Sequence, residues 1–171
     1  NILKDKFDIS LGQVISANEN PSMPSESSLG QRFSDVVGDI NFFATDDLEI
    51  NYNFSLDQNY KELIGNDVVV GFDNDKVNFN IKYLEEKNHI GNKEFTKLGL
   101  GFNLNNNNKI NFETKRNLIS NSADFYNLSY DYINDCLKAS LIYRREFYTD
   151  RDIEPSNSLM FKISIIPFTS I

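Results

Sequence analysis

Ten consecutive residues, Leu48 to Asp57, alternate between apolar and polar side chains. Successive side chains of a strand point to opposite faces of a sheet, so this period of two predicts a β-strand with one apolar and one polar face. Residues 76–83 repeat the pattern over a shorter run. The alternation constrains the fold strongly because a strand with two unlike faces needs two unlike environments.

Similar runs recur along the whole chain, with no convincing helical stretch between them. The 14 Phe and 8 Tyr residues suit pleated strands better than helices. We therefore predict an all-β chain of about ten strands. The predicted strands cover residues 5–16, 33–44, 48–57, 66–73, 76–83, 94–104, 109–117, 123–133, 136–148 and 158–168.

Two kinds of connection alternate between these strands. The short ones are rich in Asn and Asp, which tolerate the left-handed backbone of tight hairpins. They cover residues 45–47, 73–75, 105–108 and 134–135. The longer ones cover residues 17–32, 58–65, 86–93, 117–122 and 148–157. This order predicts an antiparallel up-and-down meander, as in outer-membrane barrels with short periplasmic turns and longer external loops.

The alternation leaves two architectures open. In a soluble β-protein the apolar face would form the core, whereas in a membrane barrel it would meet lipid and the polar face would line a wet interior. The predicted polar face is hydrophilic throughout, at Glu49, Asn51, Asn53, Asp57, Asn78, Asn80, Lys82, Asn103, Asn111, Glu113 and Lys115. Aromatic residues stand near strand ends, as in interface girdles, at Phe33, Phe42, Tyr83, Phe102, Tyr143 and Phe147. We expect a transmembrane β-barrel segment, with a soluble antiparallel β-protein that binds an apolar ligand as the alternative.

Composition narrows the function classes. A length of 171 residues predicts one domain, and a net charge of −8 argues against nucleic-acid binding, which needs a basic stripe. No apolar run reaches the roughly 18 to 20 residues of a spanning helix. A barrel strand needs only about 9 to 11 residues, so a mean hydropathy of −0.44 is compatible with a membrane barrel. The chain opens on Asn1 without an initiator Met, which suggests a fragment or a processed chain.

Nothing in the sequence indicates catalysis. His89 is the only histidine, and neither a second histidine nor a cysteine pair accompanies it, so we expect no metal site and no cofactor. The nucleophile elbow G-x-S-x-G is absent. We predict that the chain is not an enzyme.

Two segments carry a family resemblance. LGQVI at 11–15, a loop rich in Pro and Ser, and QRFSDVVGDINF at 31–42 stand in the order strand, long loop, strand. Residues 130–165 combine an acidic turn with cysteine, an Arg-Arg-aromatic strand, the loop sequence DRDIEP and a final strand SLMFKISI. Together they resemble the barrel region of the LptD family of lipopolysaccharide-assembly proteins, also called organic solvent tolerance proteins, over nearly the whole chain.

The resemblance implies a function and a location. Residues 1–171 would form the C-terminal part of a larger outer-membrane barrel, without the periplasmic jellyroll and the earlier strands. The barrel would be integral to the Gram-negative outer membrane and would insert lipopolysaccharide into the outer leaflet through a lateral seam. Its expected partners are lipopolysaccharide, a plug lipoprotein similar to LptE, periplasmic lipopolysaccharide-bridge proteins and outer-membrane lipid, but no nucleic acid. A generic porin-like channel is the alternative.

Cys136 is the only cysteine and follows the short turn Asn134-Asp135. A free thiol packed as a small hydrophobe is one interpretation. Under the resemblance the turn would be periplasmic, in an oxidising compartment, and a disulfide to an upstream cysteine outside this chain is implied. The family often has two adjacent cysteines here, whereas in this chain Leu137 follows.

Basic and acidic residues mix in and beside the last long connection. Contact with lipopolysaccharide phosphates is one interpretation, because Arg binds phosphate bidentately. The even mixture of charges favours a network of ion pairs that orders this external loop. The residues concerned are Arg144, Arg145, Arg151, Asp150, Asp152 and Glu154.

Pro167 lies in the predicted final strand. Proline cannot donate a ladder hydrogen bond and is typical of strand edges. It marks a candidate lateral seam together with Phe161, Ile163 and Ile165. The alternative is that the strand simply ends there.

Overall fold

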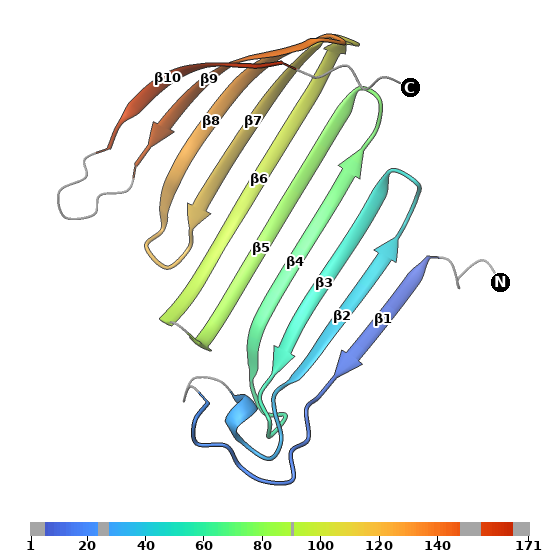
Figure 1. The fold of residues 1–171 in the computed structure, drawn as a ribbon, viewed down its shortest axis with the longest axis vertical. Helices are drawn as coiled ribbons and strands as arrows, with labels where there is room; N and C mark the ends of the chain where they lie inside the picture. Colours follow the sequence, from blue (N-terminus) through green and yellow to red (C-terminus); the bar gives the residue numbers. More distant parts are fainter. Residues whose placement is uncertain (1–5, 24–27, 90, 148–154, 166–171) are drawn as a thin grey trace. The chain divides into compact units, whose positions relative to one another are not determined.

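The computed structural model describes residues 6–23, 28–89, 91–147 and 155–165. Ten strands in this part form one sheet in chain order (Figure 1). Their bounds are β1 Phe7–Gly12, β2 Val36–Phe43, β3 Leu48–Leu56, β4 Leu63–Asp73, β5 Val77–His89, β6 Gly91–Asn105, β7 Asn108–Asn117, β8 Ser122–Ile133, β9 Leu137–Glu146 and β10 Asn157–Ile165. The all-β prediction is confirmed, and each predicted strand corresponds to one of these.

The chain divides into two compact units, which we describe separately. The first unit comprises Asn1–Gly71 and Lys82–Phe95, and the second comprises Phe72–Ile81 and Thr96–Ile171. In the first unit β1 pairs with β2 and β2 with β3, and in the second β7, β8, β9 and β10 pair in that order. All these pairings are antiparallel, as the meander predicts.

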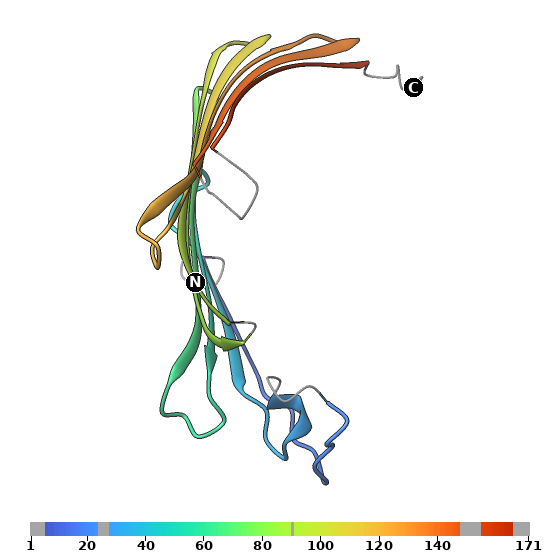
Figure 2. The ribbon, with the colours of Figure 1, turned by 90° about the vertical axis from the view of Figure 1, so that its left-hand side faces the viewer.

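Each unit is a single layer of strands, seen edge-on in Figure 2. No hydrophobic side chain is buried among the described residues. A two-layer soluble domain, by contrast, buries one apolar face of a sheet against another element. β1 and β10 each pair with one neighbour in the described residues, so closure into a barrel remains a prediction.

The prediction of a long loop over residues 86–93 is wrong. β5 continues to His89 and β6 begins at Gly91, with Ile90 outside the described residues. β4 likewise begins at Leu63 rather than at residue 66. At β5 and β6 the charged residues Glu86, Lys87 and Lys93 led the sequence analysis to predict a loop, although an antiparallel strand with a solvated face can carry charged residues.

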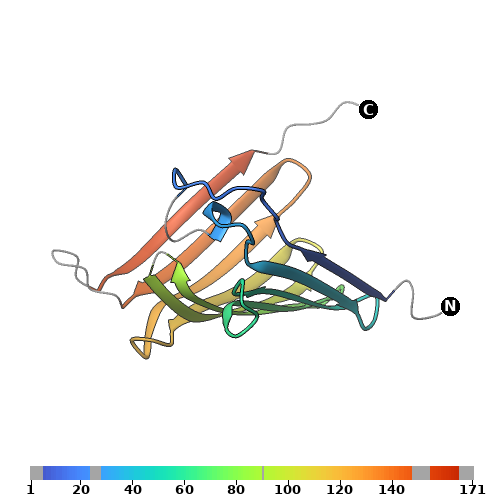
Figure 3. The ribbon, with the colours of Figure 1, turned by 90° about the horizontal axis from the view of Figure 1, so that it is seen from below.

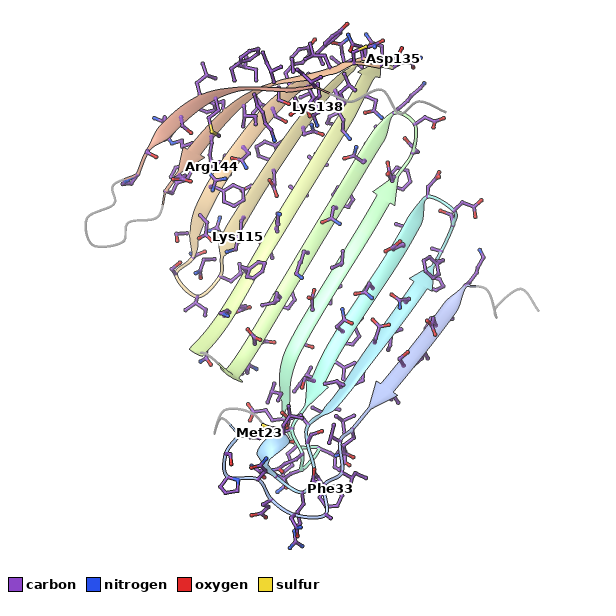
Figure 4. The ribbon with its side chains drawn as sticks, viewed as in Figure 1. Met23, Phe33, Lys115, Asp135, Lys138 and Arg144 are labelled. Carbon is purple, nitrogen blue, oxygen red and sulfur yellow. The ribbon has the colours of Figure 1, made fainter. Side chains whose placement is uncertain are left out.

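The connection between β1 and β2 is the longest in the described part and carries its own structure (Figure 3, with Met23 and Phe33 labelled in Figure 4). A 3-10 turn, η1, spans Ser28–Gly30, and Ile15 forms an isolated bridge with Phe33. The amide of Val14 donates to the Ser34 hydroxyl at 2.9 Å. No described helix is both long and apolar enough to cross a membrane.

Candidate functional site

The register of the first three strands sorts their side chains onto two faces. Asp39 lies opposite Asn53, and Asn41 lies opposite Asn51. The alternate positions are apolar, because Ile40 of β2 lies opposite Ile9 of β1 and opposite Tyr52 of β3. The first unit therefore has one polar and one apolar face over β1, β2 and β3.

The polar face of the first unit is a hydrogen-bonded ladder. The Asn51 amide donates to Asp39 Oδ2 at 2.9 Å and to Asn41 Oδ1 at 2.5 Å. Asn53 donates to Asn51 Oδ1 at 2.7 Å, and Asn41 donates to Asp39 Oδ1 at 2.6 Å. These hydrogen bonds hold the four side chains in fixed positions, although they lie on an open face of the sheet.

An open hollow of about 580 Å³ lies on the first unit. Small residues on three strands leave room for it, at Gly12, Ser55 and Gly65. Acidic side chains line it, among them Asp67, whose Oδ2 atom forms a salt bridge with Lys82 Nζ at 2.7 Å. The other carboxylate oxygen of Asp67 is buried and has no hydrogen-bond partner within the described part.

The second unit has the same division into two faces. Its polar face places Glu113 opposite Asn127, and Asn127 opposite Arg144. Ion pairs follow this face, and three of their basic members are labelled in Figure 4. The pairs are Lys97–Glu113, Lys115–Asp124 at 2.9 Å, Lys138–Asp131 at 3.8 Å and Arg144–Glu146 at 2.6 Å.

The opposite face of the second unit is apolar and open. Leu128 lies opposite Tyr143, and Tyr143 lies opposite Leu159. All three are exposed, at 49%, 43% and 69%. A large apolar face left exposed marks a surface that meets lipid or a partner.

Cys136 lies in the turn between β8 and β9, not at the start of a strand as predicted. Its thiol is free and exposed within the described chain. The turn is closed by the Asn134 side chain, whose Oδ1 atom accepts the amides of Cys136 at 3.0 Å and Leu137 at 2.7 Å. Asp135, labelled in Figure 4, is the remaining turn residue. The structure therefore presents the thiol at the edge of the sheet that carries the short turns.

The two adjacent arginines of β9 belong to opposite faces. Arg144 pairs in register with Asn127 on the polar face, and its guanidinium lies 4.5 Å from the centre of the Phe125 ring. Arg145 pairs with Tyr126, and its guanidinium lies 4.8 Å from the Phe147 ring. The other members of the predicted ion network, Arg151, Asp150, Asp152 and Glu154, lie outside the described residues.

The candidate seam residues of β10 share its apolar face. Phe161, Ile163 and Ile165 are 68%, 58% and 82% exposed. Phe161 lies opposite Leu141 and Ile163 opposite Ala139, on the one strand that β10 pairs with in the described residues. Pro167 lies outside the described residues.

The described residues contain no group of three or more His, Cys, Asp or Glu side chains that could hold a metal ion. The His89 side chain is outside the described set. Sequence reasoning missed the hollow, because its small residues are scattered over several strands. It also missed Asn66 and Glu85, which hydrogen-bond at 2.9 Å, because its predicted strand ended at residue 83 and it examined no face of β4.

Comparison with known proteins identifies the family. No curated protein matches this chain. The sequence model described as "LptD: LPS transport system D" matches residues 3–125, well over half of the chain. The match ends before the cysteine turn, so the likeness noted over residues 130–165 stays a prediction. On the match to residues 3–125, this chain belongs to the LptD family of lipopolysaccharide transport proteins.

Proposed function

We propose that this chain forms part of the wall of an outer-membrane β-barrel that inserts lipopolysaccharide into the outer leaflet. The observation that carries the proposal is the family match, since the family is one of lipopolysaccharide transport and assembly. The two-faced single layer of strands supports it, because a barrel wall needs one lipid face and one wet face. The proposed role is transport rather than catalysis.

The two faces fit two different environments, namely hydrocarbon and the sugar head group of the cargo. The apolar face of β8, β9 and β10 would meet hydrocarbon, since Leu128, Tyr143 and Leu159 are exposed there. The ladder built on Asn51 would line the interior and offer hydrogen bonds to a sugar head group. A soluble protein that binds an apolar ligand fits less well, because the described residues bury no hydrophobic side chain. A generic porin-like channel is disfavoured by the family match.

The proposed partners follow from the proposed role. They are lipopolysaccharide, outer-membrane lipid, a plug lipoprotein similar to LptE, and the periplasmic proteins that bridge lipopolysaccharide to the barrel. The chain would be the C-terminal part of the barrel domain. The lateral seam would involve β10, where Phe161 and Ile163 are exposed beside a free strand edge within the described part.

A disulfide at Cys136 is a separate proposal. The exposed position of the thiol in a short turn supports it, because short turns of outer-membrane barrels face the oxidising periplasm. Mass spectrometry of the full-length protein without reductant tests it directly. We expect a peptide containing Cys136 linked to an upstream cysteine, and a Cys136 thiol that is fully alkylated without reduction contradicts it.

Depletion of the full-length protein in growing cells tests the function. We expect newly made lipopolysaccharide to stop reaching the cell surface, as measured by a membrane-impermeant label, while general porins still appear in the outer membrane. Restored expression should restore surface labelling. Unchanged surface delivery after depletion contradicts the proposal, and a loss of small-solute uptake alone would favour the channel.

A further inference from the structure

A polar cluster interrupts the apolar face of the first unit. The Tyr52 hydroxyl donates to Asn66 Oδ1 at 2.8 Å, and the Asn66 amide donates to Glu85 Oε2 at 2.9 Å. Lys87 Nζ lies 3.0 Å from Glu85 Oε1. Tyr52 belongs to the apolar face, since it pairs in register with Ile40. The cluster therefore lies on the face that carries Ile9 and Ile40.

Strand geometry places the rest of the cluster on the same face. Alternate residues of a strand share a face, so Tyr83 lies with Glu85 and Lys87 along β5. The Tyr83 hydroxyl donates to Glu94 Oε1 at 3.1 Å, which brings β6 into the cluster. Before Tyr83, the same alternate positions of β5 are Val77, Phe79 and Ile81. The face thus changes from apolar to charged at Tyr83.

Charged groups and tyrosines have different places in a membrane. An ionised side chain is expensive in hydrocarbon, even when it is paired. Tyrosine favours the interface, where its ring meets the acyl chains and its hydroxyl meets water. The side chains of Lys87 and Glu85 are 42% and 24% exposed, so part of the pair is open to whatever covers this face. A membrane that covers the apolar face must end before this pair.

We propose that the outer boundary of the membrane hydrocarbon crosses β5 and β6 at Tyr83, whereas on β3 the apolar face continues past Tyr52 to Phe54 and Leu56. The end of β5 beyond Tyr83, residues 84–89, then stands in the polar head-group layer of the outer leaflet. At about 3.4 Å per residue and a strand tilt near 40°, this strand end projects roughly 15 Å beyond the hydrocarbon. The inference rests on the proposed outer-membrane location.

The cluster also explains why long strands replace the loop that the charges suggested. Asn66 and Glu94 hold neighbouring strands to β5 through side-chain hydrogen bonds. Lys93 Nζ lies 3.5 Å from Glu86 Oε2 and adds a link on the opposite face. An outer-leaflet partner would therefore meet a wall of paired strands here.

A fluorescent amino acid with a small polarity-sensitive side chain, introduced by codon suppression at one position at a time, tests the boundary. The full-length protein is reconstituted in bilayers and probed with two quenchers, aqueous iodide and lipids that carry a nitroxide on the acyl chain. The positions are Ile81 below the boundary, Lys87 and Glu94 above it, and Asn80 on the polar face as the matched control.

We expect the acyl-chain nitroxide to quench the label at Ile81, and iodide to quench the labels at Lys87, Glu94 and Asn80. Acyl-chain quenching at Lys87 and Glu94 equal to that at Ile81 overturns the boundary and leaves the membrane location intact. Iodide quenching at Ile81 equal to that at Asn80 overturns the membrane location itself. The two upper positions lie on separate strands, so the test remains decisive if one variant fails to assemble.

Discussion

The ring of Phe54 occupies the space that a side chain on Gly38 would need. The two residues pair directly across β2 and β3. A Cβ atom added to Gly38 would overlap the Phe54 ring and come within 2.9 Å of Leu11 Cδ2. Glycine at this position therefore lets the Phe54 ring pack directly over the backbone of β2 on the apolar face.

Gly38→Ala should destabilise the full-length protein by about 1–3 kcal/mol, because the added methyl group forces Phe54 and Leu11 to move. Gly71→Ala is the matched control, since a Cβ atom there meets nothing within 4 Å. Urea unfolding in detergent measures both. Equal midpoints for the two variants would show that the Phe54 ring is not held in this place.

Asn51→Ala should destabilise the protein more than Asn53→Ala. Asn51 makes side-chain hydrogen bonds to Asp39, Asn41 and Asn53, whereas the Asn53 side chain makes one within the ladder. Each bond contributes about 0.5–1.5 kcal/mol, so the difference should be about 1–3 kcal/mol. The same unfolding assay measures it, and a larger loss for Asn53→Ala would contradict the ladder.

Leu128→Arg should destabilise the membrane-inserted protein by about 2–4 kcal/mol if its face meets the middle of the hydrocarbon. Asn127→Arg, one residue away on the polar face, should be tolerated. Asn127 donates to Glu113 Oε2 at 3.3 Å, so a guanidinium there gains an acidic neighbour. Folding in lipid vesicles compares the two variants, and the reverse order would mean that the faces are assigned the wrong way round.

The pKa of Asp57 lies below its ordinary value near 3.8, chiefly because its carboxylate accepts the backbone amide of Lys61, and also that of Glu62. The ionised form is thus favoured in the folded connection 57–62. The stabilisation it gives is fully present above pH 3.8 and is lost as the pH falls through the lower folded pKa. NMR titration of Asp57, assigned with Asp57→Asn, should give a midpoint below 3.8. A midpoint at or above it would contradict these hydrogen bonds.

The sequence predicted the ten strands and both faces because alternation can be read within each strand alone. The register between strands then places apolar residues beside apolar ones and polar residues beside polar ones. β3 is the clearest example, since the residues around Asn51 sort onto the faces that the period of two predicts. The ends of β5 and β6 were missed, because the charges of Glu85 and Lys87 suggest a loop until their partners on other strands are known. The hollow and the overlap of Phe54 with Gly38 depend on cross-strand register, which one strand's sequence does not contain.

The measurement that tests the central claim most directly is photocrosslinking in growing cells. A photoreactive amino acid replaces Asn51 on the polar face or Ile50 on the apolar face of the full-length protein. We predict that the Asn51 position crosslinks to lipopolysaccharide while synthesis continues and loses the signal when synthesis is stopped, because the cargo moves on. The Ile50 position should keep a steady signal from membrane lipid. An assembled protein that never crosslinks lipopolysaccharide from the Asn51 position would contradict a transport role for the polar face.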